Sequence, residues 1–160
     1  DALDHPDAVD AAKALLDANG DAYRPSNLII ADNRDAFWIA HEGEDKVHVH
    51  PIEPGVHLIS HNDLDTGLRA ETHLARAREG VPEGAMDDPK SWERWVALLS
   101  ERAEPDSEYW EAALNVDVPD WGFGTVSSAM IALPSMHDEG AKPVFMFADG
   151  PGDQATYKPV

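Results

Sequence analysis

The sequence predicts an α+β fold, in which helices are layered on antiparallel sheet. Its 160 residues contain segments of helical and of strand periodicity that are grouped along the chain: one helix, four strands, two or three helices, and two strands. The four strands are joined by short links, which suit antiparallel neighbours because parallel strands need a long crossover. Grouped rather than alternating elements indicate helices packed against an antiparallel sheet.

The first half of the chain opens with the predicted helix and continues as the four strands. Apolar residues recur at helical spacing from Ala8 to Leu16, and Gly20 is placed to end the helix. Short apolar or alternating runs then predict strands over residues 28–31, 36–40, 46–52 and 56–60. The first two strands form a hairpin, because the residues between them are turn formers.

The second half contains the remaining helices and strands. Helical spacing predicts helices over residues 69–78, 91–101 and 107–114. The second of these helices is strongly amphipathic, with one face formed by Trp92, Trp95, Val96 and Leu99. We interpret that face as packing surface, with ligand stacking by the two tryptophans as the alternative. Alternating residues predict the last two strands, over 124–133 and 143–148.

Charge and composition exclude several functions. The chain carries 12 Lys and Arg against 31 Asp and Glu, so its net charge is −19, which repels nucleic acid and anionic lipid. No apolar run approaches the roughly 18 residues of a membrane span, and no signal peptide is visible. The absence of cysteine removes disulfides, thiolate zinc sites and a cysteine nucleophile from this stretch. We expect one soluble, cytoplasmic domain over residues 1–160. Its core is thin, because Leu, Ile, Val and Phe form only about a fifth of the chain.

Histidines are the first candidate ligands. Eight are present, and five lie between His41 and His61. His48 and His50 are two residues apart in a predicted strand, so they share one face and would bind a transition metal or haem iron if a third ligand were supplied. Together with His57 they are the candidate haem or metal residues. The alternative is a solvent-facing pair on a half-buried strand. No resident metal is predicted, since neither cysteine nor an HExxH spacing is present.

Two polar stretches are candidate ligand-binding segments. Thr125 and Ser127 point the same way from one predicted strand and would line a polar pocket, and the adjacent Ser128 is a further ligand-binding candidate. The alternative is hydroxyl bonding between neighbouring strands. Asn62 and Asp65 lie in a polar loop that would supply an acid, a base or an amide donor, or would cap the following helix. GxSxG, P-loop and GxGxxG motifs are absent from the sequence.

Three blocks of the sequence carry a resemblance to a known family. They are Tyr23–Asp32 (YRPSNLIIAD), Gly122–Ser128 (GFGTVSS), and Pro54–Ser60 (PGVHLIS) followed by Asn62, Leu64 and Asp65. On these blocks the chain resembles the NRDE family, also called the transport and Golgi organization protein family. The closing FADG at residues 147–150 resembles its bacterial members. The resemblance extends over roughly the whole chain.

The resemblance implies the fold of N-terminal-nucleophile hydrolases, an αββα sandwich with antiparallel sheets between helical layers. The family's Asn-Arg-Asp-Glu motif follows a first strand that begins behind a cysteine. Here residues 33–35 (NRD) precede Ala36 in a later turn, and the cysteine and its strand are missing. Val126 also stands where many relatives have arginine. We therefore expect the C-terminal portion of a longer protein, with a fold that is incomplete at its N-terminus.

The resemblance also guides the functional expectation. In that superfamily the first residue after processing attacks an amide, with its own amine as base. Asp1 cannot do this, so no catalytic residue is predicted in this chain. The family is linked to haem mobilisation and lipid homeostasis, which implies a soluble small-ligand protein such as a haem carrier. Haem is the one cofactor that this suggests, and the expected partners are the small ligand and the upstream segment of the same protein.

Two alternatives stay open at this stage. The first is a hydrolase of peptide or non-peptide amide bonds whose catalytic cysteine lies in the upstream segment. Its substrate would be oriented, or its oxyanion site built, by Asn62, Asp65, Thr125 and Ser127. The second is a non-catalytic interaction domain.

Overall fold

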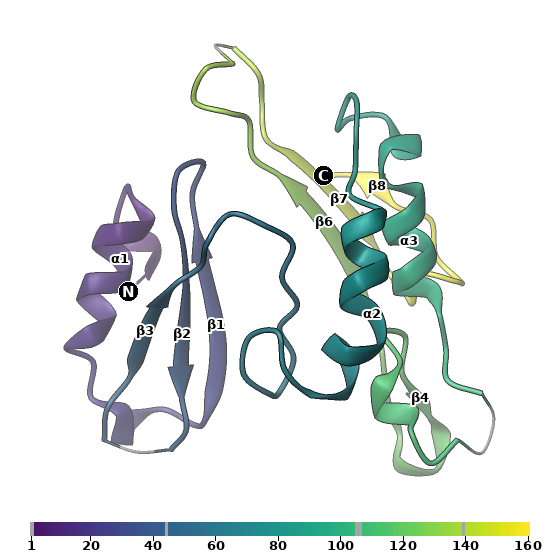
Figure 1. Cartoon of the computed structure of the whole chain (residues 1–160), viewed down its shortest axis with the longest axis horizontal. Helices are drawn as coiled ribbons and strands as arrows, with labels where there is room; N and C mark the ends of the chain where they lie inside the picture. The colour runs from purple at the N-terminus through teal and green to yellow at the C-terminus, as the bar shows by residue number, and fades with distance from the viewer. Residues whose placement is uncertain (1, 44, 105–106, 139) are drawn as a thin grey trace. The chain divides into compact units, whose positions relative to one another are not determined.

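The computed structural model describes residues 2–43, 45–104, 107–138 and 140–160, which form two compact units. Unit 1 comprises Asp1–Leu64 and Pro134–Gly140, and unit 2 comprises Asp65–Leu133 and Ala141–Val160. Both mix helix with small antiparallel sheets, which confirms the predicted α+β class (Figure 1). No helix in the described ranges combines the length and the apolar character that crossing a membrane requires.

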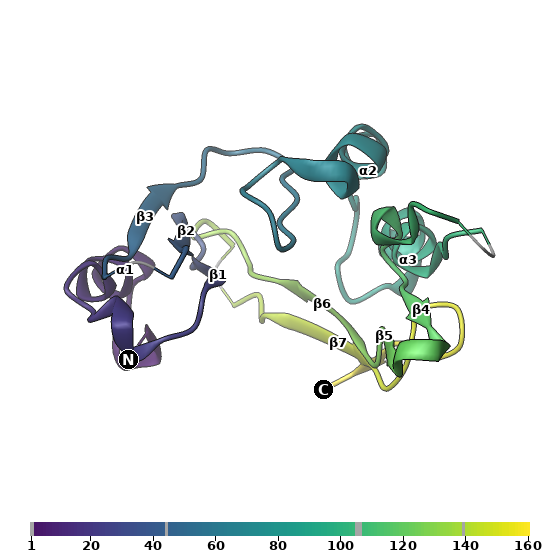
Figure 2. The same ribbon diagram turned by 90° about the horizontal axis from the view of Figure 1, so that it is seen from below.

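Unit 1 is a helix packed on a three-stranded antiparallel sheet. Short 3-10 turns at Ala2–Asp4 and Gly20–Ala22 flank helix α1 (Ala8–Leu16). The sheet has the order β1-β2-β3, formed by the strands β1 (Ser26–Ala31), β2 (Ala36–His41) and β3 (His48–Pro51). The helix buries Ala8, Ala11 and Ala12, whereas Leu16, which also belongs to the predicted apolar pattern, is exposed. Figure 2 shows α1 lying along one side of this sheet.

Asp32 ties the β1–β2 turn to the start of α1. Its Oδ2 accepts a hydrogen bond of 2.9 Å from the backbone N–H of Ala8, one of the donors that a helix start leaves unpaired. Its Oδ1 accepts from the N–H groups of Arg34 and Asp35 inside the turn. These hydrogen bonds hold the pKa of Asp32 below its usual value, and the bond from Ala8 has the largest effect.

Replacing Asp32 with alanine is expected to lower the free energy of unfolding by about 1 to 2 kcal/mol, because three N–H groups lose their acceptor. Chemical denaturation followed by far-UV circular dichroism measures the change. Asp35→Ala is the matched control: it removes an exposed carboxylate from the same turn and is expected to cost less than about 0.5 kcal/mol. Equal losses in the two variants would contradict the capping role of Asp32.

The predicted fourth strand, over residues 56–60, is wrong. The sheet of unit 1 contains three strands, and the described residues 52–64 form bends and loop after β3. Residues 56–60 are all half-buried, so the alternation of their side chains does not correspond to one buried and one exposed face. The end of this loop is held by a side chain, because the carbonyl oxygens of Ser60 and Asn62 accept from the amide of Asn27.

The described residues of unit 2 form two further α-helices and two small sheets. Helix α2 (Gly67–Glu79) and α3 (Glu93–Ser100) are the predicted pair, although α3 is preceded by the 3-10 turn Pro89–Trp92. One sheet pairs β4 (Asp117–Val118) with β5 (Phe123–Gly124). The other has the order β6-β7-β8, formed by β6 (Ser128–Ala132), β7 (Val144–Ala148) and β8 (Lys158–Pro159).

The core of unit 2 lies between α3 and the inner face of the β6–β7 ladder. Trp92, Met130 and Met146 are its buried residues, and Trp95, Val96 and Tyr157 are among those packed around them. Alternation places Ile131, Phe145 and Phe147 on the opposite face, where all three are exposed. We call these three residues the outer face of β6–β7.

Two predicted elements of this half are wrong in extent. The strand expected over 124–133 is divided between two sheets, because residues 125–127 lie outside both β5 and β6. Thr125 follows β5 and still bonds to the neighbouring segment. Its N–H donates to the carbonyl oxygen of Val116, and its hydroxyl accepts from the N–H of Val116. The helix expected over 107–114 is a single 3-10 turn, Trp110–Ala112.

Candidate functional site

Three aromatic side chains form a row across the sheet of unit 1, on one face. Register pairs Trp38 of β2 with His50 of β3, and their ring centroids are 5.0 Å apart. His48 follows, with its ring stacked on that of His50 at 6.4 Å and 20°. The shared face predicted for the two histidines is thereby confirmed. We call Trp38, His50 and His48 the Trp38 row.

Asn27 fixes the position of the indole in this row. Its Oδ1 accepts a 2.9 Å hydrogen bond from Trp38 Nε1. Its Nδ2 donates to the carbonyl oxygens of Ser60, at 3.0 Å, and Asn62, at 2.9 Å. One side chain of β1 therefore holds the indole on one side and the loop that follows β3 on the other. This connects Asn62 to the Trp38 row through its backbone carbonyl.

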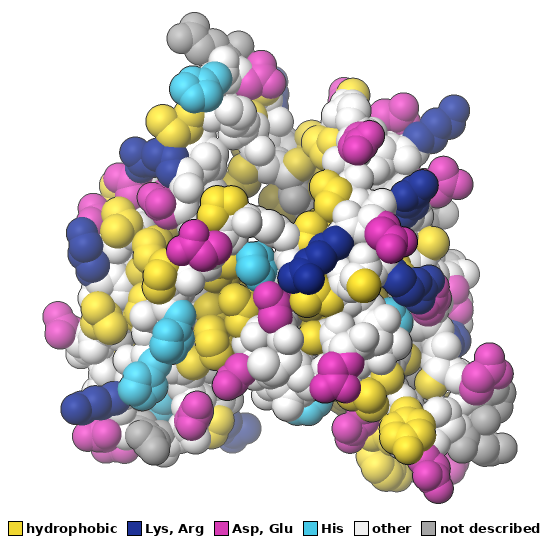
Figure 3. All heavy atoms as spheres, viewed as in Figure 1, with side chains coloured by type: hydrophobic (Ala, Val, Ile, Leu, Met, Phe, Trp, Pro, Cys, Tyr) yellow, Lys and Arg dark blue, Asp and Glu magenta, His cyan; other side chains and the backbone are white. Residues whose placement is uncertain are grey.

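The two histidines of the row are accessible for a ligand. Both side chains are exposed, and no residue in the described part of the chain makes a hydrogen bond or ion pair to their ring nitrogens. Figure 3 shows imidazoles (cyan) on the visible surface over β2 and β3, with acidic side chains scattered around them. Among the described residues no group of three or more His, Cys, Asp or Glu is arranged to hold a metal ion.

His57, the third histidine candidate, lies outside the Trp38 row. Its Nε2 is 2.9 Å from the carbonyl oxygen of Glu53, and the ring packs close to Gly55 in the turn between them. The side chain is half-buried. This placement makes His57 a part of the loop structure rather than a third exposed imidazole.

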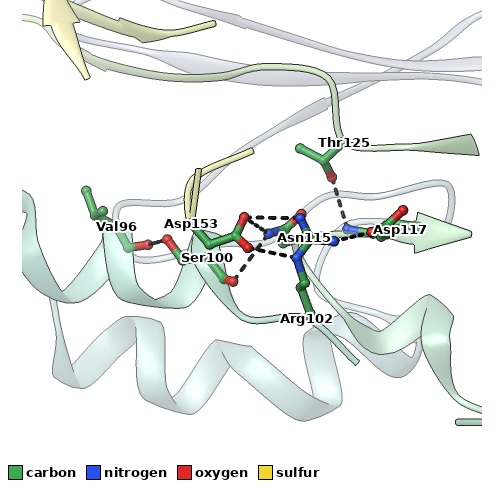
Figure 4. A network of polar contacts seen from close by, with 8 residues as sticks. Val96, Ser100, Arg102, Asn115, Asp117, Thr125 and Asp153 are labelled. Carbon is green, nitrogen blue, oxygen red and sulfur yellow. Dashed lines mark hydrogen bonds and ion pairs between the residues drawn. The ribbon is translucent and has the colours of Figure 1, made fainter. Parts of the chain in front are cut away.

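A second polar cluster ties together three segments of unit 2 (Figure 4). The guanidinium of Arg102 binds Asp153, with Nε to Oδ2 at 2.8 Å and Nη2 to Oδ1 at 3.3 Å, and also binds Asp117. Asn115 is fully buried, and its Nδ2 donates to Asp153 Oδ1 at 2.6 Å and to the carbonyl oxygen of Ser100. We call Arg102, Asn115, Asp117 and Asp153 the Arg102 network.

The charges of this network stabilise one another. The hydrogen bond from Arg102 holds the pKa of Asp153 below its usual value, and the bond from Asn115 acts in the same direction against partial desolvation. The network joins the segment after α3, the strand β4 and the loop before β8. All of its charged groups are paired with one another. The network is therefore arranged to stabilise the fold of unit 2 rather than to bind a ligand.

Of the predicted hydroxyl residues, Thr125 lies close to this network, and the three do not line a common pocket among the cavities described below. The hydroxyl of Thr125 accepts from the N–H of Val116 at 3.0 Å, which is the bonding between neighbouring segments that the sequence left as an alternative. Ser127 is exposed, and Ser128 is half-buried at the start of β6. Asp65 has a φ of 59° and precedes α2, whose N-cap position falls on Thr66.

Two cavities in unit 2 involve residues that the sequence did not single out as a site. One, of about 550 Å³, opens beside the core at Val96, Met130, Met146 and Tyr157. The other, of about 400 Å³, is lined by Arg102, Trp110 and Asn115 among others. None of the predicted ligand-binding residues lines either cavity. The predicted set is instead divided, with Asn62 in unit 1 and the other members in unit 2.

Sequence reasoning missed Asn27, Trp38 and the whole Arg102 network. Trp38 and His50 could have been linked only by knowing the β2–β3 register, and Arg102 contacts a residue 51 positions away. Comparisons of the chain with family models, with curated proteins and with solved structures found no significant match.

Proposed function

We propose that this chain is an NRDE-family protein that binds haem and passes it on, with His48 and His50 as its exchangeable iron ligands. One observation carries the proposal: two exposed imidazoles stack side by side next to an indole, and no described residue occupies their ring nitrogens. Imidazole is the most common protein ligand of haem iron.

The number of ligands favours haem over a bare metal ion. Zinc sites in proteins need at least three protein ligands, and the described residues contain no such cluster. Haem brings four nitrogens of its own, so a single imidazole, from either His48 or His50, is enough to hold its iron. The macrocycle also needs a flat apolar surface beside the iron, and the Trp38 indole supplies one next to His50.

The setting of the histidines suits transfer rather than permanent binding. Both are on an exposed sheet face, where a ligand leaves without any rearrangement of a core. The net charge of −19 repels the two haem propionates, which weakens binding further. The resemblance to the family supports the same proposal, because its block 23–32 includes Asn27, the residue that positions Trp38.

Titration of the protein with ferric haem is expected to shift the Soret band, and the double variant His48→Ala/His50→Ala is expected to bind at least about tenfold more weakly. The matched control is His137→Ala, which removes another exposed imidazole of unit 1 that does not belong to the Trp38 row. Far-UV circular dichroism of each variant shows that the fold is retained.

Three outcomes would contradict the proposal. The first is the absence of a Soret shift in the wild-type protein at micromolar haem. The second is an unchanged affinity in the double variant. The third is an equal loss in His137→Ala, which would indicate non-specific adsorption of haem to surface histidines.

A further inference from the structure

The outer edge of β1 carries unpaired backbone groups. In the hairpin the N–H of Asp32 donates to the carbonyl oxygen of Asp35 at 3.0 Å, so these two residues form a hydrogen-bonded pair. Pairs alternate along an antiparallel ladder, so the next pair, Ala31 with Ala36, directs its backbone groups away from the partner strand. The bond from Ile52 N–H to the Ala36 carbonyl, on the β3 side, agrees with this assignment.

Continuing the alternation gives the free edge of the sheet. Asn27, Ile29 and Ala31 direct their N–H and C=O groups outward, because β1 is the edge strand of the order β1-β2-β3. No charged residue or proline lies within Ser26–Ala31 to block pairing, and Ile29 is 39% exposed. Sheet edges in folded proteins are normally blunted by such residues or covered.

The opposite edge of the same sheet is blunted. By the same alternation, Val49 and Pro51 direct their backbone groups outward from β3. Pro51 has no N–H, so one of the outward donors is absent. β3 also has only four residues. A neighbouring strand is therefore expected at β1 and not at β3.

We propose that β1 pairs with β1 of a second copy of this chain, in antiparallel register about Ile29. The outward residues stand at positions 27, 29 and 31, which are symmetric about the middle one. A two-fold axis at Ile29 therefore opposes it to its own copy and opposes Asn27 to Ala31 on both sides. Each of these three pairs is hydrogen-bonded, so the register leaves no outward group of β1 unpaired.

This pairing produces a closed dimer. Both β1 edges are consumed at the two-fold axis, and the edges that remain are the β3 strands blunted by Pro51. The result is a continuous six-stranded sheet that cannot readily add further strands at its own two edges. Two chains of charge −19 repel each other, so association is expected to strengthen with added salt.

Sedimentation velocity of the whole chain tests the proposal in about 0.3 M salt, where long-range repulsion is screened. We expect a concentration-dependent species of twice the 17.5 kDa chain mass. Ile29→Lys opposes two like charges on the axis and is expected to weaken dimerisation at least about tenfold. Ile131→Lys is the control: it makes the same change at an exposed residue of β6, an uncharged edge strand of unit 2.

Hydrogen exchange gives a second test that needs no variant. The amides of Asn27, Ile29 and Ala31 are expected to be protected only at dimer concentrations, whereas those of Leu28 and Ile30 are protected at all concentrations. A wild-type chain that sediments at 17.5 kDa throughout the concentration and salt series would overturn the proposal. A dimer dissociated by Ile131→Lys and not by Ile29→Lys would overturn it as well.

Discussion

Replacing Trp92 with alanine is expected to lower the free energy of unfolding of unit 2 by about 3 to 5 kcal/mol. Trp92 is 3% exposed and packs against both buried methionines of the core. Its ring also lies edge-on to Trp95 at 6.3 Å, and its Nε1 donates to the carbonyl oxygen of Met86 at 2.8 Å. The variant loses apolar burial, leaves a cavity and leaves a carbonyl without its donor, and these effects act in the same direction.

Urea unfolding of the full chain, followed by far-UV circular dichroism, measures this loss. Trp121→Ala is the matched control, since it removes the same side chain from a position that is 70% exposed. We expect it to cost less than about 1 kcal/mol, because only its edge contact with Trp110 is lost. A control variant as unstable as Trp92→Ala would show that the core of unit 2 is not centred on Trp92.

Replacing Asp153 with asparagine is expected to lower stability by about 1 to 2 kcal/mol at pH 7, with a loss that depends on pH. The variant keeps the shape of the side chain but removes the charge that Arg102 binds, and it replaces one of the two oxygens that accept from Arg102 and Asn115 with an NH2 group, which cannot accept. This expected loss of stability is at the low end for a charged hydrogen bond, because the side chains of Arg102 and Asp153 are about 30% exposed and solvent weakens their attraction.

The direction of the pH dependence follows from the lowered pKa of Asp153. A carboxyl whose pKa is lower in the folded state contributes stability above its unfolded value of about 3.9. That contribution is lost as the pH falls through the folded pKa. The difference between wild type and Asp153→Asn is therefore expected to be complete at pH 7 and to close in acid below about pH 4.

Thermal unfolding at a series of pH values measures this convergence. Asp149→Asn is the control, since it makes the same charge change at an exposed position of the same loop. We expect it to follow the wild-type curve. A constant difference between Asp153→Asn and wild type at every pH would contradict the ion pair as the cause.

Elements that depend on local pattern could be predicted from the sequence. Helix α1 begins at the predicted Ala8, and α2 extends only a few residues beyond the predicted 69–78. The hairpin of β1 and β2 follows from two apolar runs around a turn. The strand predicted over residues 56–60 was wrong, because a short run of alternating side chains occurs in a half-buried loop as well as in a strand.

The candidate site shows the same division between local and distant information. The shared face of His48 and His50 follows from the two-residue period of a strand, and the structure confirms it. Their role as ligands, and the membership of the NRDE family, remain proposals. Asn27 could not be found from the sequence, because its partners Ser60 and Asn62 are more than 30 residues away. Contacts between residues so far apart depend on the register of the strands and on the path of the loops. A short stretch of sequence determines neither of these.

The outer face of β6–β7 affects how this protein behaves on a chromatographic column. Ile131 is 62% exposed, and Phe145 and Phe147 are 40% and 37% exposed beside it. A chain of charge −19 is retained strongly by an anion exchanger at low salt. At high ammonium sulfate its charges are screened, and the three apolar side chains would hold it on a phenyl matrix. One molecule thus has an acidic surface suited to solubility and an apolar sheet face that salts out.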